Sequence, residues 1–369
     1  MGTEEFLIEV KDLTKTYGRK KAIDRLSFNV QKGEVVGFLG PNGAGKSTTM
    51  RILCGLMPAS SGEATVCGIP LASHSREVKK YVGYMPENNP LPTELRVDEY
   101  LRFRGQLKGL EGSVLRRRVD EVLELCDLRR SAEQRIIGNL SKGYRQRVGI
   151  AEALVAEPRL VVMDEPTIGL DPHQVKIIRK LIERLRGEKT FFVSSHILSE
   201  VETSCDRVLI INHGRIVAEG SLNKLREKFA PEVLFEVYVA GEPEDILKEI
   251  LKVNSSIEKL EEGKLGEDGF QRVLFRAERN KDVTEQVAIR LAKSGKVRLR
   301  EIRAAEPDLE EIFMRATQRS WEVETPLGPI QDKFAKTEQG ETESDEEGSA
   351  DAPEKKGKDS KNTKGKKAV

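Results

Sequence analysis

The most constraining feature of this sequence is the stretch GPNGAGKS at residues 40–47, which fits the pattern G-x-x-x-x-G-K-[ST]. The apolar run Val35–Leu39 before it predicts a buried strand, and the residues from Thr48 to Leu53 predict a helix. Glycines allow consecutive backbone N–H groups to converge on phosphate oxygens, and the start of the helix adds a partial positive charge. The pattern therefore predicts a loop that holds the phosphates of a nucleoside triphosphate, with a simple turn as the alternative.

Two side chains of this loop carry chemistry of their own. Lys46 should reach the β- and γ-phosphates as a point charge, and the hydroxyl of Ser47 should enter the Mg²⁺ shell. The candidate nucleotide-binding residues of the loop are Gly40, Pro41, Asn42, Gly43, Ala44, Gly45, Lys46, Ser47 and Thr48.

The charge of the chain is high but balanced, with 62 Lys and Arg against 61 Asp and Glu. This balance provides no overall attraction to nucleic acid or acidic lipid, so no nucleic-acid partner is expected. No apolar run approaches the ~18 residues of a membrane span, and the N-terminus lacks the regions of a signal peptide. We therefore expect a cytoplasmic protein. The cysteines show no metal-site spacing and are interpreted as small buried hydrophobes: Cys54, Cys67, Cys126 and Cys205.

Two carboxylates follow a second apolar run. Residues 160–163, LVVM, predict a parallel strand buried on both faces, and Asp164 and Glu165 come directly after it. Carboxylates at the end of a buried strand are costly unless they have a function. Asp164 would hold Mg²⁺, usually through water, and Glu165 would polarise the water that attacks the γ-phosphate. Solvated acids at a surface strand end are the alternative.

Two further strand ends carry candidate groups. His196 follows the apolar strand at residues 190–194, where ligands collect in open α/β sheets, and would contact the γ-phosphate or orient Glu165. Glu87 follows the strand Val82–Met85, and its carboxylate would reach a metal or a water.

A helix start and an aromatic residue complete the candidate set. Ser141 is a good N-cap for the helix that follows, and its hydroxyl, the nearby Gly143 and the free amides would make a second phosphate-binding surface. An ordinary capped helix is the alternative. Tyr17 lies in a loop between two predicted strands, where it would stack on a nucleobase, but the local sequence by itself favours the alternative of an exposed tyrosine.

Together these residues resemble the nucleotide-binding subunit of ABC transporters, over about residues 8–229. In the terms of that family, residues 40–47 match the Walker A loop, residues 160–164 match Walker B, and residues 140–146 match the LSGGQ-type signature. The resemblance also implies roles for single residues: a catalytic glutamate (Glu165), a D-loop aspartate (Asp171), a switch histidine (His196) and an adenine-stacking aromatic (Tyr17).

The sequence departs from the family pattern at two places. Glu87 stands where the family usually has Gln; a side-chain oxygen remains available to Mg²⁺, but it brings a second negative charge toward the phosphates. The signature reads LSKGYRQ, with Lys142 and Tyr144 in place of the usual residues. Ser141 and Gly143, which the family uses to touch phosphate, are retained.

The resemblance implies an α/β fold of the P-loop NTPase type, with a mixed sheet core and a helical insert at about residues 97–156. It implies ATP and Mg²⁺ as cofactors, and a second ATPase subunit that faces the first head to tail, whether identical or different. It also implies membrane permease subunits that dock near Glu87 and the insert, at the inner face of the cell membrane. The alternatives are a soluble ABC ATPase acting on ribosomes or DNA, and a non-catalytic nucleotide-binding regulator.

The remainder of the chain divides into two parts. Residues 231–320 predict a βαββαβ order, typical of a ferredoxin-like accessory domain, following a cassette at residues 1–230. The segment DLEEIF at residues 308–313 begins a capped helix similar to one that ends the ATPase subunits of ABC-2-type exporters, which favours export. Residues 321–369 lose apolar content and are predicted to be a disordered charged tail, with contact of its lysines with anionic lipid or nucleic acid as the alternative.

Overall fold

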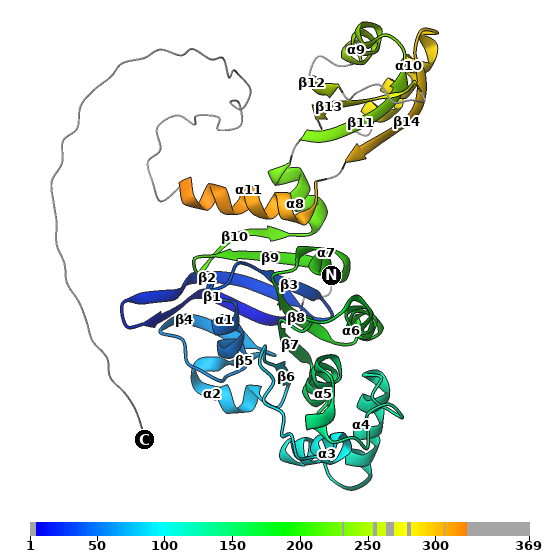
Figure 1. Ribbon diagram of the computed structural model, residues 1–369. Coiled ribbons are helices and arrows are strands. Elements are labelled where there is room, and N and C mark those ends of the chain that lie inside the picture. Colours follow the sequence, from blue (N-terminus) through cyan, green and yellow to red (C-terminus); the bar gives the residue numbers. More distant parts are fainter. Residues whose placement is uncertain are drawn as a thin grey trace, which may run out of the picture. The chain divides into compact units, whose positions relative to one another are not determined.

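The computed structural model describes residues 5–230, 232–253, 257–262, 269–278, 282–305 and 307–322 (Figure 1). The charged tail predicted for residues 321–369 lies outside these ranges, except for its first two residues, which complete a helix. Within the described ranges, no helix has both the length and the apolar content that a bilayer crossing requires.

A six-stranded sheet forms the centre of the structure, with the strand order β10-β9-β3-β8-β7-β6. Five of its strands are parallel, and only β10 at one edge runs antiparallel to its neighbour. The strands are β3 (Val35–Leu39), β6 (Val82–Met85), β7 (Leu160–Asp164), β8 (Thr190–Ser195), β9 (Arg207–Asn212) and β10 (Arg215–Gly220).

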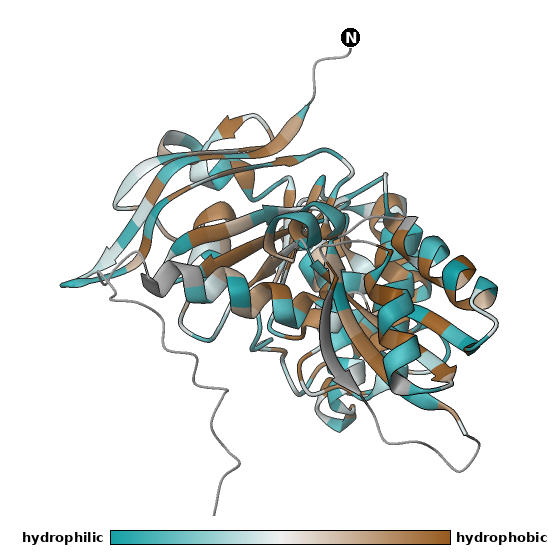
Figure 2. Cartoon of the chain, turned by 90° about the horizontal axis from the view of Figure 1, so that it is seen from above, coloured by the Kyte–Doolittle hydropathy of each residue, from teal (hydrophilic) through white to brown (hydrophobic). Residues whose placement is uncertain are grey.

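The central strands are apolar because both of their faces are covered. Every residue of β3, β7 and β8 is buried, which matches the continuous apolar runs read from the sequence. Figure 2 shows hydrophobic residues concentrated in the strands and alternating with polar residues on the outer helices. Cys54 and Cys126 are buried as expected, whereas Cys67 and Cys205 are half-buried.

A second, antiparallel sheet packs beside the first, with the order β2-β1-β4-β5. The rings of Phe28 from this sheet and Phe192 from the central sheet stack with their centroids 5.7 Å apart, which joins the two sheets in one core. Its strands are β1 (Phe6–Tyr17), β2 (Lys20–Gln31), β4 (Ser61–Val66) and β5 (Ile69–Pro70). Tyr17 therefore ends a strand, whereas the sequence predicted a loop at this residue.

Helices surround the central sheet and extend past its β6 edge. The predicted helical insert is present and contains α3 (Val97–Leu107), α4 (Gly112–Leu125), a short 3-10 helix (Ile137–Asn139) and α5 (Lys142–Leu154). The other helices of this part are α1 (Lys46–Leu53), α2 (Leu71–Val78), α6 (Pro172–Leu185), α7 (Leu198–Ser204) and α8 (Leu222–Phe229). The expected P-loop α/β fold with a mixed sheet is thus confirmed.

The segment after α8 has the predicted βαββαβ order and its own core. Its elements are β11 (Glu232–Ala240), α9 (Pro243–Leu251), β12 (Glu258–Glu262), β13 (Gln271–Glu278), α10 (Asp282–Lys293) and β14 (Arg298–Ala305). The strands form an antiparallel sheet with the order β12-β13-β11-β14, the arrangement of a ferredoxin-like unit. Val237 and Phe275 from the sheet and Val287 from α10 lie in this core.

The last described helix, α11 (Leu309–Glu322), belongs to a different core. Leu309 and Ile312 are buried against Ile210 of β9 and Leu225 of α8. The sequence had grouped this helix with the accessory segment, whereas its apolar contacts are with elements that precede that segment. The boundary proposed at residue 230 stays a prediction.

Candidate active site

The phosphate loop connects β3 to α1 with the backbone geometry that its glycines allow. Gly43 and Gly45 have φ values of 80° and 111°, which residues with a Cβ rarely adopt. A Cβ at Gly45 would also lie 2.6 Å from the carbonyl oxygen of Ala22. Pro41, Asn42 and Gly43 are exposed, so the tip of the loop is open to a ligand.

Lys46 is the first residue of α1 and is almost fully buried beneath the loop. Its Nζ donates a hydrogen bond to the carbonyl oxygen of Gly40 at 2.7 Å, and it lies 3.4 Å from Oε1 of Glu165. The predicted phosphate-binding lysine and the predicted catalytic glutamate, which are far apart in sequence, are therefore neighbours. Ser47 and Thr48 follow on the same helix and are half-buried.

The end of β7 is tied to the end of β8 by a serine that no sequence motif identifies. The hydroxyl of Ser194 donates to Oδ1 of Asp164 at 2.6 Å and accepts from the backbone N–H of Glu165 at 2.9 Å. All three residues are buried. The available signal was a polar residue inside the apolar run at residues 190–194, which a strand buried on both faces tolerates only when its hydroxyl is bonded.

Glu165 contacts His196 directly, in the arrangement that the sequence predicted as one of two possibilities. Nδ1 of His196 lies 2.7 Å from Oε2 of Glu165, and the backbone N–H of His196 donates to the same oxygen at 3.3 Å. The other oxygen, Oε1, is buried and makes no protein hydrogen bond, because the nearby Nζ of Lys46 lacks the required geometry.

The signature segment is anchored to the loop that follows Glu165. Gln146 of α5 donates a hydrogen bond from Nε2 to the carbonyl oxygen of Pro166 at 2.8 Å. Gly143 packs so closely on Gln174 that a Cβ there would lie 2.8 Å from its side-chain oxygen. Ser141 occupies the predicted N-cap position, but its side chain is exposed and makes no capping hydrogen bond. The prediction that the Ser141 side chain caps this helix is therefore wrong.

The two unusual signature residues have local explanations. The Lys142 ammonium lies against Gly169, in the turn before α6. The ring of Tyr144 lies 4.3 Å from the guanidinium of Arg147, a fully buried cation that also donates to the carbonyl oxygen of Asp127 at 2.7 Å. Tyr144 thus covers a buried charge inside the helical insert.

The remaining predicted residues lie at the surface. Asp171 caps α6, because its carboxylate accepts a hydrogen bond from the backbone N–H of Gln174 at 3.0 Å. Tyr17 is exposed, and the ammonium of Lys15 lies 5.4 Å from its ring centroid. Glu87 is exposed just beyond β6. Lys46, Asp164, Glu165 and His196 are therefore brought together, while Tyr17, Glu87, Ser141 and Asp171 are exposed and make no described contact with these four residues.

The oxygen donors of this site fit a magnesium ion that is bound mainly through a nucleotide. Among the described residues, no group of three or more His, Cys, Asp or Glu side chains could hold a metal by itself. Mg²⁺ typically keeps several waters and takes one or two protein ligands together with substrate phosphates. The Ser47 hydroxyl and the Asp164 carboxylate are ligands of that kind.

These features define a P-loop nucleotide-binding protein: a strand, a glycine loop and a helix that starts with a buried lysine, with two carboxylates at the end of another parallel strand of the same sheet. Residues 23–168 match a family model described as ABC transporter. The chain belongs to the family of ATP-binding subunits of ABC transporters. Relatives that resemble it over most of its length support this assignment.

Two of these relatives are bacterial proteins. The Nod factor export ATP-binding protein I of Rhizobium sp. strain N33 is 35% identical over 317 residues, covering 85% of this chain and 98% of the relative. The linearmycin resistance ATP-binding protein LnrL of Bacillus subtilis is 32% identical, covering 85% of this chain and 99% of the relative. Matches of this length extend beyond the cassette, so they include part of the accessory segment.

Solved structures resemble the cassette portion. An ATP-binding subunit of an ABC transporter is 34% identical with a TM-score of 0.56, and the match covers 60% of this chain and 93% of that one. A dimeric ATP-binding cassette in a post-hydrolysis state, bound to ADP and Pi, is 27% identical with a TM-score of 0.55, covering 58% and 98%.

Proposed function

We propose that this chain binds and hydrolyses ATP as one of two facing subunits that power an exporter through a separate membrane permease. The main observation behind the proposal is the buried Glu165 carboxylate. One of its oxygens contacts His196, and the other lies 3.4 Å from Nζ of Lys46 and makes no protein hydrogen bond. Such an oxygen is placed to accept a hydrogen bond from water.

The residues of the site have distinct roles in hydrolysis. Lys46 exchanges its contact with the Gly40 carbonyl for the β- and γ-phosphates, and the loop amides surround the same oxygens. Ser47, Glu87 and, usually through water, Asp164 would hold Mg²⁺, and a bound ion would supply charge neutralisation for the phosphates. Glu165 orients the attacking water and accepts its proton, and His196 keeps that carboxylate in place.

Two of the exposed candidate residues are placed where a second subunit could contact them. This chain carries one phosphate loop and one signature, and Ser141 and Asp171 are exposed. In the proposed dimer, Ser141 and Gly143 of one subunit bind the γ-phosphate held by the phosphate loop of the other, and Tyr17 stacks on the base. ATP binding then closes the pair, and hydrolysis reopens it.

A basic groove beside the helical insert supports docking of a permease. The groove has a volume of about 630 Å³ and lies among α2, β6, α3 and α5. Burial, followed by the charge of Arg104, lowers the pKa of Lys108 in this groove. Leu107 at its rim is 63% exposed. The other basic residues that line the groove are Arg76, Lys79 and Lys80.

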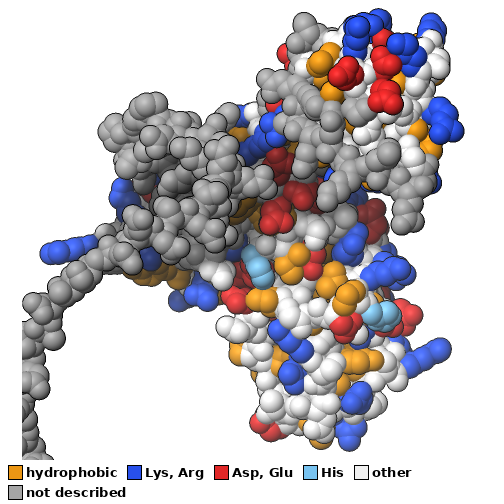
Figure 3. Space-filling model, turned by 45° about the horizontal axis from the view of Figure 1, so that its top comes forward, with side chains coloured by type: hydrophobic (Ala, Val, Ile, Leu, Met, Phe, Trp, Pro, Cys, Tyr) orange, Lys and Arg blue, Asp and Glu red, His pale blue; other side chains and the backbone are white. Residues whose placement is uncertain are grey.

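The location and direction of transport follow from the same proposal. We place the subunit in the cytoplasm, peripheral on the inner face of the membrane through the permease. Export is favoured over import because two relatives are named for Nod factor export and linearmycin resistance. The face seen in Figure 3 intersperses acidic and basic side chains, so it lacks the single-sign surface that favours action on ribosomes or DNA.

A disulfide-trapping experiment tests the shared site. Asn42→Cys and Ser141→Cys are combined in a Glu165→Gln background, and the purified chain is oxidised with ATP and Mg²⁺ or with ADP. The proposal predicts a covalent dimer with ATP and little with ADP. Each single-cysteine variant is the control, since neither places two new thiols at one interface. A double variant that stays monomeric with ATP contradicts the composite site between two copies of this chain.

A further inference from the structure

The segments that follow β7 and β8 are joined by two side-chain contacts. The first is the contact between Glu165 and His196 described above. The second lies two residues further along one segment and four residues further along the other, where the Thr167 hydroxyl donates a hydrogen bond to the Glu200 carboxylate. Thr167 is buried, and Glu200 lies in the first turn of α7. The segment after β8 is therefore joined to the segment after β7 at two residues, His196 and Glu200.

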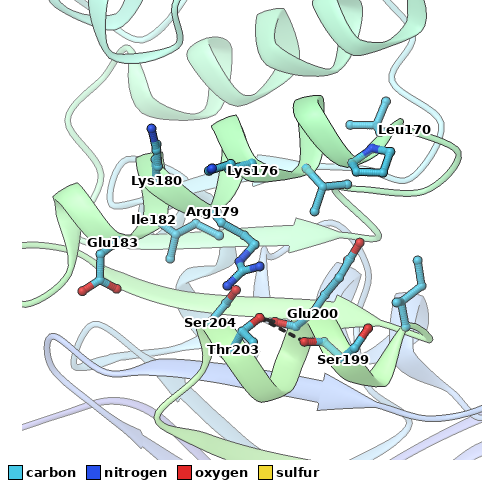
Figure 4. Close-up of a pocket in the computed structure, with 13 residues that line it drawn as sticks. Leu170, Lys176, Arg179, Lys180, Ile182, Glu183, Ser199, Glu200, Thr203 and Ser204 are labelled. Carbon is cyan, nitrogen blue, oxygen red and sulfur yellow. Dashed lines mark hydrogen bonds between the residues drawn. The ribbon is translucent and has the colours of Figure 1, made fainter.

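Glu200 occupies a groove of about 1020 Å³ between α6 and α7. Figure 4 shows Arg179 entering this groove from α6 and Glu200 entering it from α7. Burial raises the pKa of Glu200, and the negative charge of Glu165 raises it further, while the Thr167 hydrogen bond and the charges of His196 and Arg179 act in the opposite direction. The Glu200 carboxylate is therefore close enough to Glu165 and His196 for their charges to affect its pKa.

The backbone of Glu165 explains why a second contact is needed. Its φ of 51° lies in the left-handed region, which costs a non-glycine residue free energy and persists only where the surroundings fix it. Ser194 bonds the N–H of Glu165. On the other side of Glu165, Gln146 bonds the carbonyl oxygen of Pro166, and Thr167 bonds Glu200. Among the hydrogen bonds of the described residues, the last is the one that joins a residue of α7 to the segment after Glu165.

We propose that Thr167 and Glu200 are positioning residues for hydrolysis, because their hydrogen bond fixes α7 against the Glu165 segment and so sets the separation of Glu165 and His196. This inference rests on the proposed ATPase function. It predicts that loss of the bond lowers kcat, because the carboxylate is misplaced, and leaves KM for ATP nearly unchanged, because the phosphate loop is untouched.

Substitutions at Thr167 provide the first test, using steady-state ATPase measurements on the full chain. Thr167→Val keeps the shape of the side chain and removes its hydroxyl, so kcat should fall about 10- to 100-fold with KM within about 2-fold. Thr167→Ser should restore kcat. The matched control is Thr203→Val, which removes a hydroxyl of the same groove that bonds the α7 backbone at the Ser199 carbonyl oxygen. Its kcat should stay within about 2-fold of the wild-type value.

Glu200 provides a second, independent test. Glu200→Gln retains an oxygen that accepts from Thr167 and should keep most of the activity, whereas Glu200→Ala should match Thr167→Val. The double variant Thr167→Val with Glu200→Ala should lose no more than either single variant, since both remove one bond. Wild-type kcat in folded Thr167→Val or Glu200→Ala overturns the inference. Absence of ATP turnover in the wild-type chain instead overturns the proposed ATPase function, so the two failures are distinguishable.

Discussion

Glu165 and Glu236 are both buried carboxylates, with 5% and 7% of their surface exposed, but their surroundings differ. Glu236, in the accessory sheet, accepts hydrogen bonds from Arg272, from Arg303 at 2.6 Å and from the Tyr238 hydroxyl at 3.1 Å. Both of its oxygens are bonded. Glu165 has one bonded oxygen, and its second makes no protein hydrogen bond.

The difference indicates which carboxylate is structural and which is available for chemistry. A buried carboxylate with bonded oxygens is stabilised in one place and one charge state, so replacing it should change stability. A buried carboxylate with an unbonded oxygen is costly to fold and can bind a water or a phosphate-linked group. Glu165 should therefore control turnover, and Glu236 should control stability.

Removal of Lys46 should have the largest effect. Lys46→Ala deletes the cation 3.4 Å from the unbonded oxygen of Glu165 and the expected partner of the β- and γ-phosphates. ATP turnover should fall at least about 100-fold, as measured by phosphate release. The control is Lys32→Ala, which deletes an exposed lysine paired with Glu5. Unchanged ATP affinity and turnover rate in Lys46→Ala would contradict the assignment of residues 40–47 as the phosphate-binding loop.

Replacement of Glu236 should affect folding instead of turnover. Glu236→Gln leaves Arg272 and Arg303 without their carboxylate, so the free energy of unfolding should fall by about 1–3 kcal/mol. Urea unfolding measures this loss. Glu301→Gln is the control, because Glu301 is an exposed partner of Arg303 at 3.9 Å, and such pairs contribute about 0–1 kcal/mol. A folded Glu236→Gln protein without ATPase activity would contradict the claim that Glu236 acts on stability and not on turnover.

The pH dependence of stability should distinguish the wild type from Glu236→Gln. The hydrogen bond from Arg303 is the main cause that holds the pKa of Glu236 below its ordinary value. A lowered folded-state pKa adds stability above the unfolded-state pKa, and this stability is lost as pH falls through the folded-state pKa. The difference in Tm between the two proteins should thus shrink from about pH 6 to about pH 3. If the difference in Tm did not change with pH, the loss of stability in Glu236→Gln would come from altered packing and not from the lost charge.

Deletion of residues 323–369 should have the smallest effect. These residues follow α11 and include none of the residues assigned to the active site. Phosphate release and the Tm should both stay at wild-type values. A large loss of ATPase activity would show that hydrolysis depends on this segment.

The strands and the phosphate loop could be predicted from the sequence because their patterns are local. Continuous apolar runs predicted β3, β7 and β8, since strands covered on both faces have no polar alternation. Glycine spacing predicted the loop before Lys46. The contact of His196 with Glu165 was one of the two alternatives predicted for the histidine, and it forms because the carboxyl ends of neighbouring parallel strands meet at one edge of the sheet.

Other features could not be predicted because they depend on contacts between distant segments. Ser194 resembled a strand residue until its hydroxyl was found between Asp164 and Glu165. Thr167 and Glu200 lie 33 positions apart and carry no motif that pairs them. Ser141 satisfied the sequence rule for an N-cap but does not make the bond, since side-chain orientation is not encoded in residue type alone.

Single-turnover hydrolysis of bound ATP by Glu165→Gln tests the central claim most directly, with Glu236→Gln measured in parallel. The account predicts that Glu165→Gln binds ATP, accumulates as a dimer on size exclusion and hydrolyses ATP about 10²- to 10⁴-fold more slowly than the wild type. Glu236→Gln should hydrolyse ATP at the wild-type rate. Normal hydrolysis by Glu165→Gln would contradict the role of this carboxylate as the base.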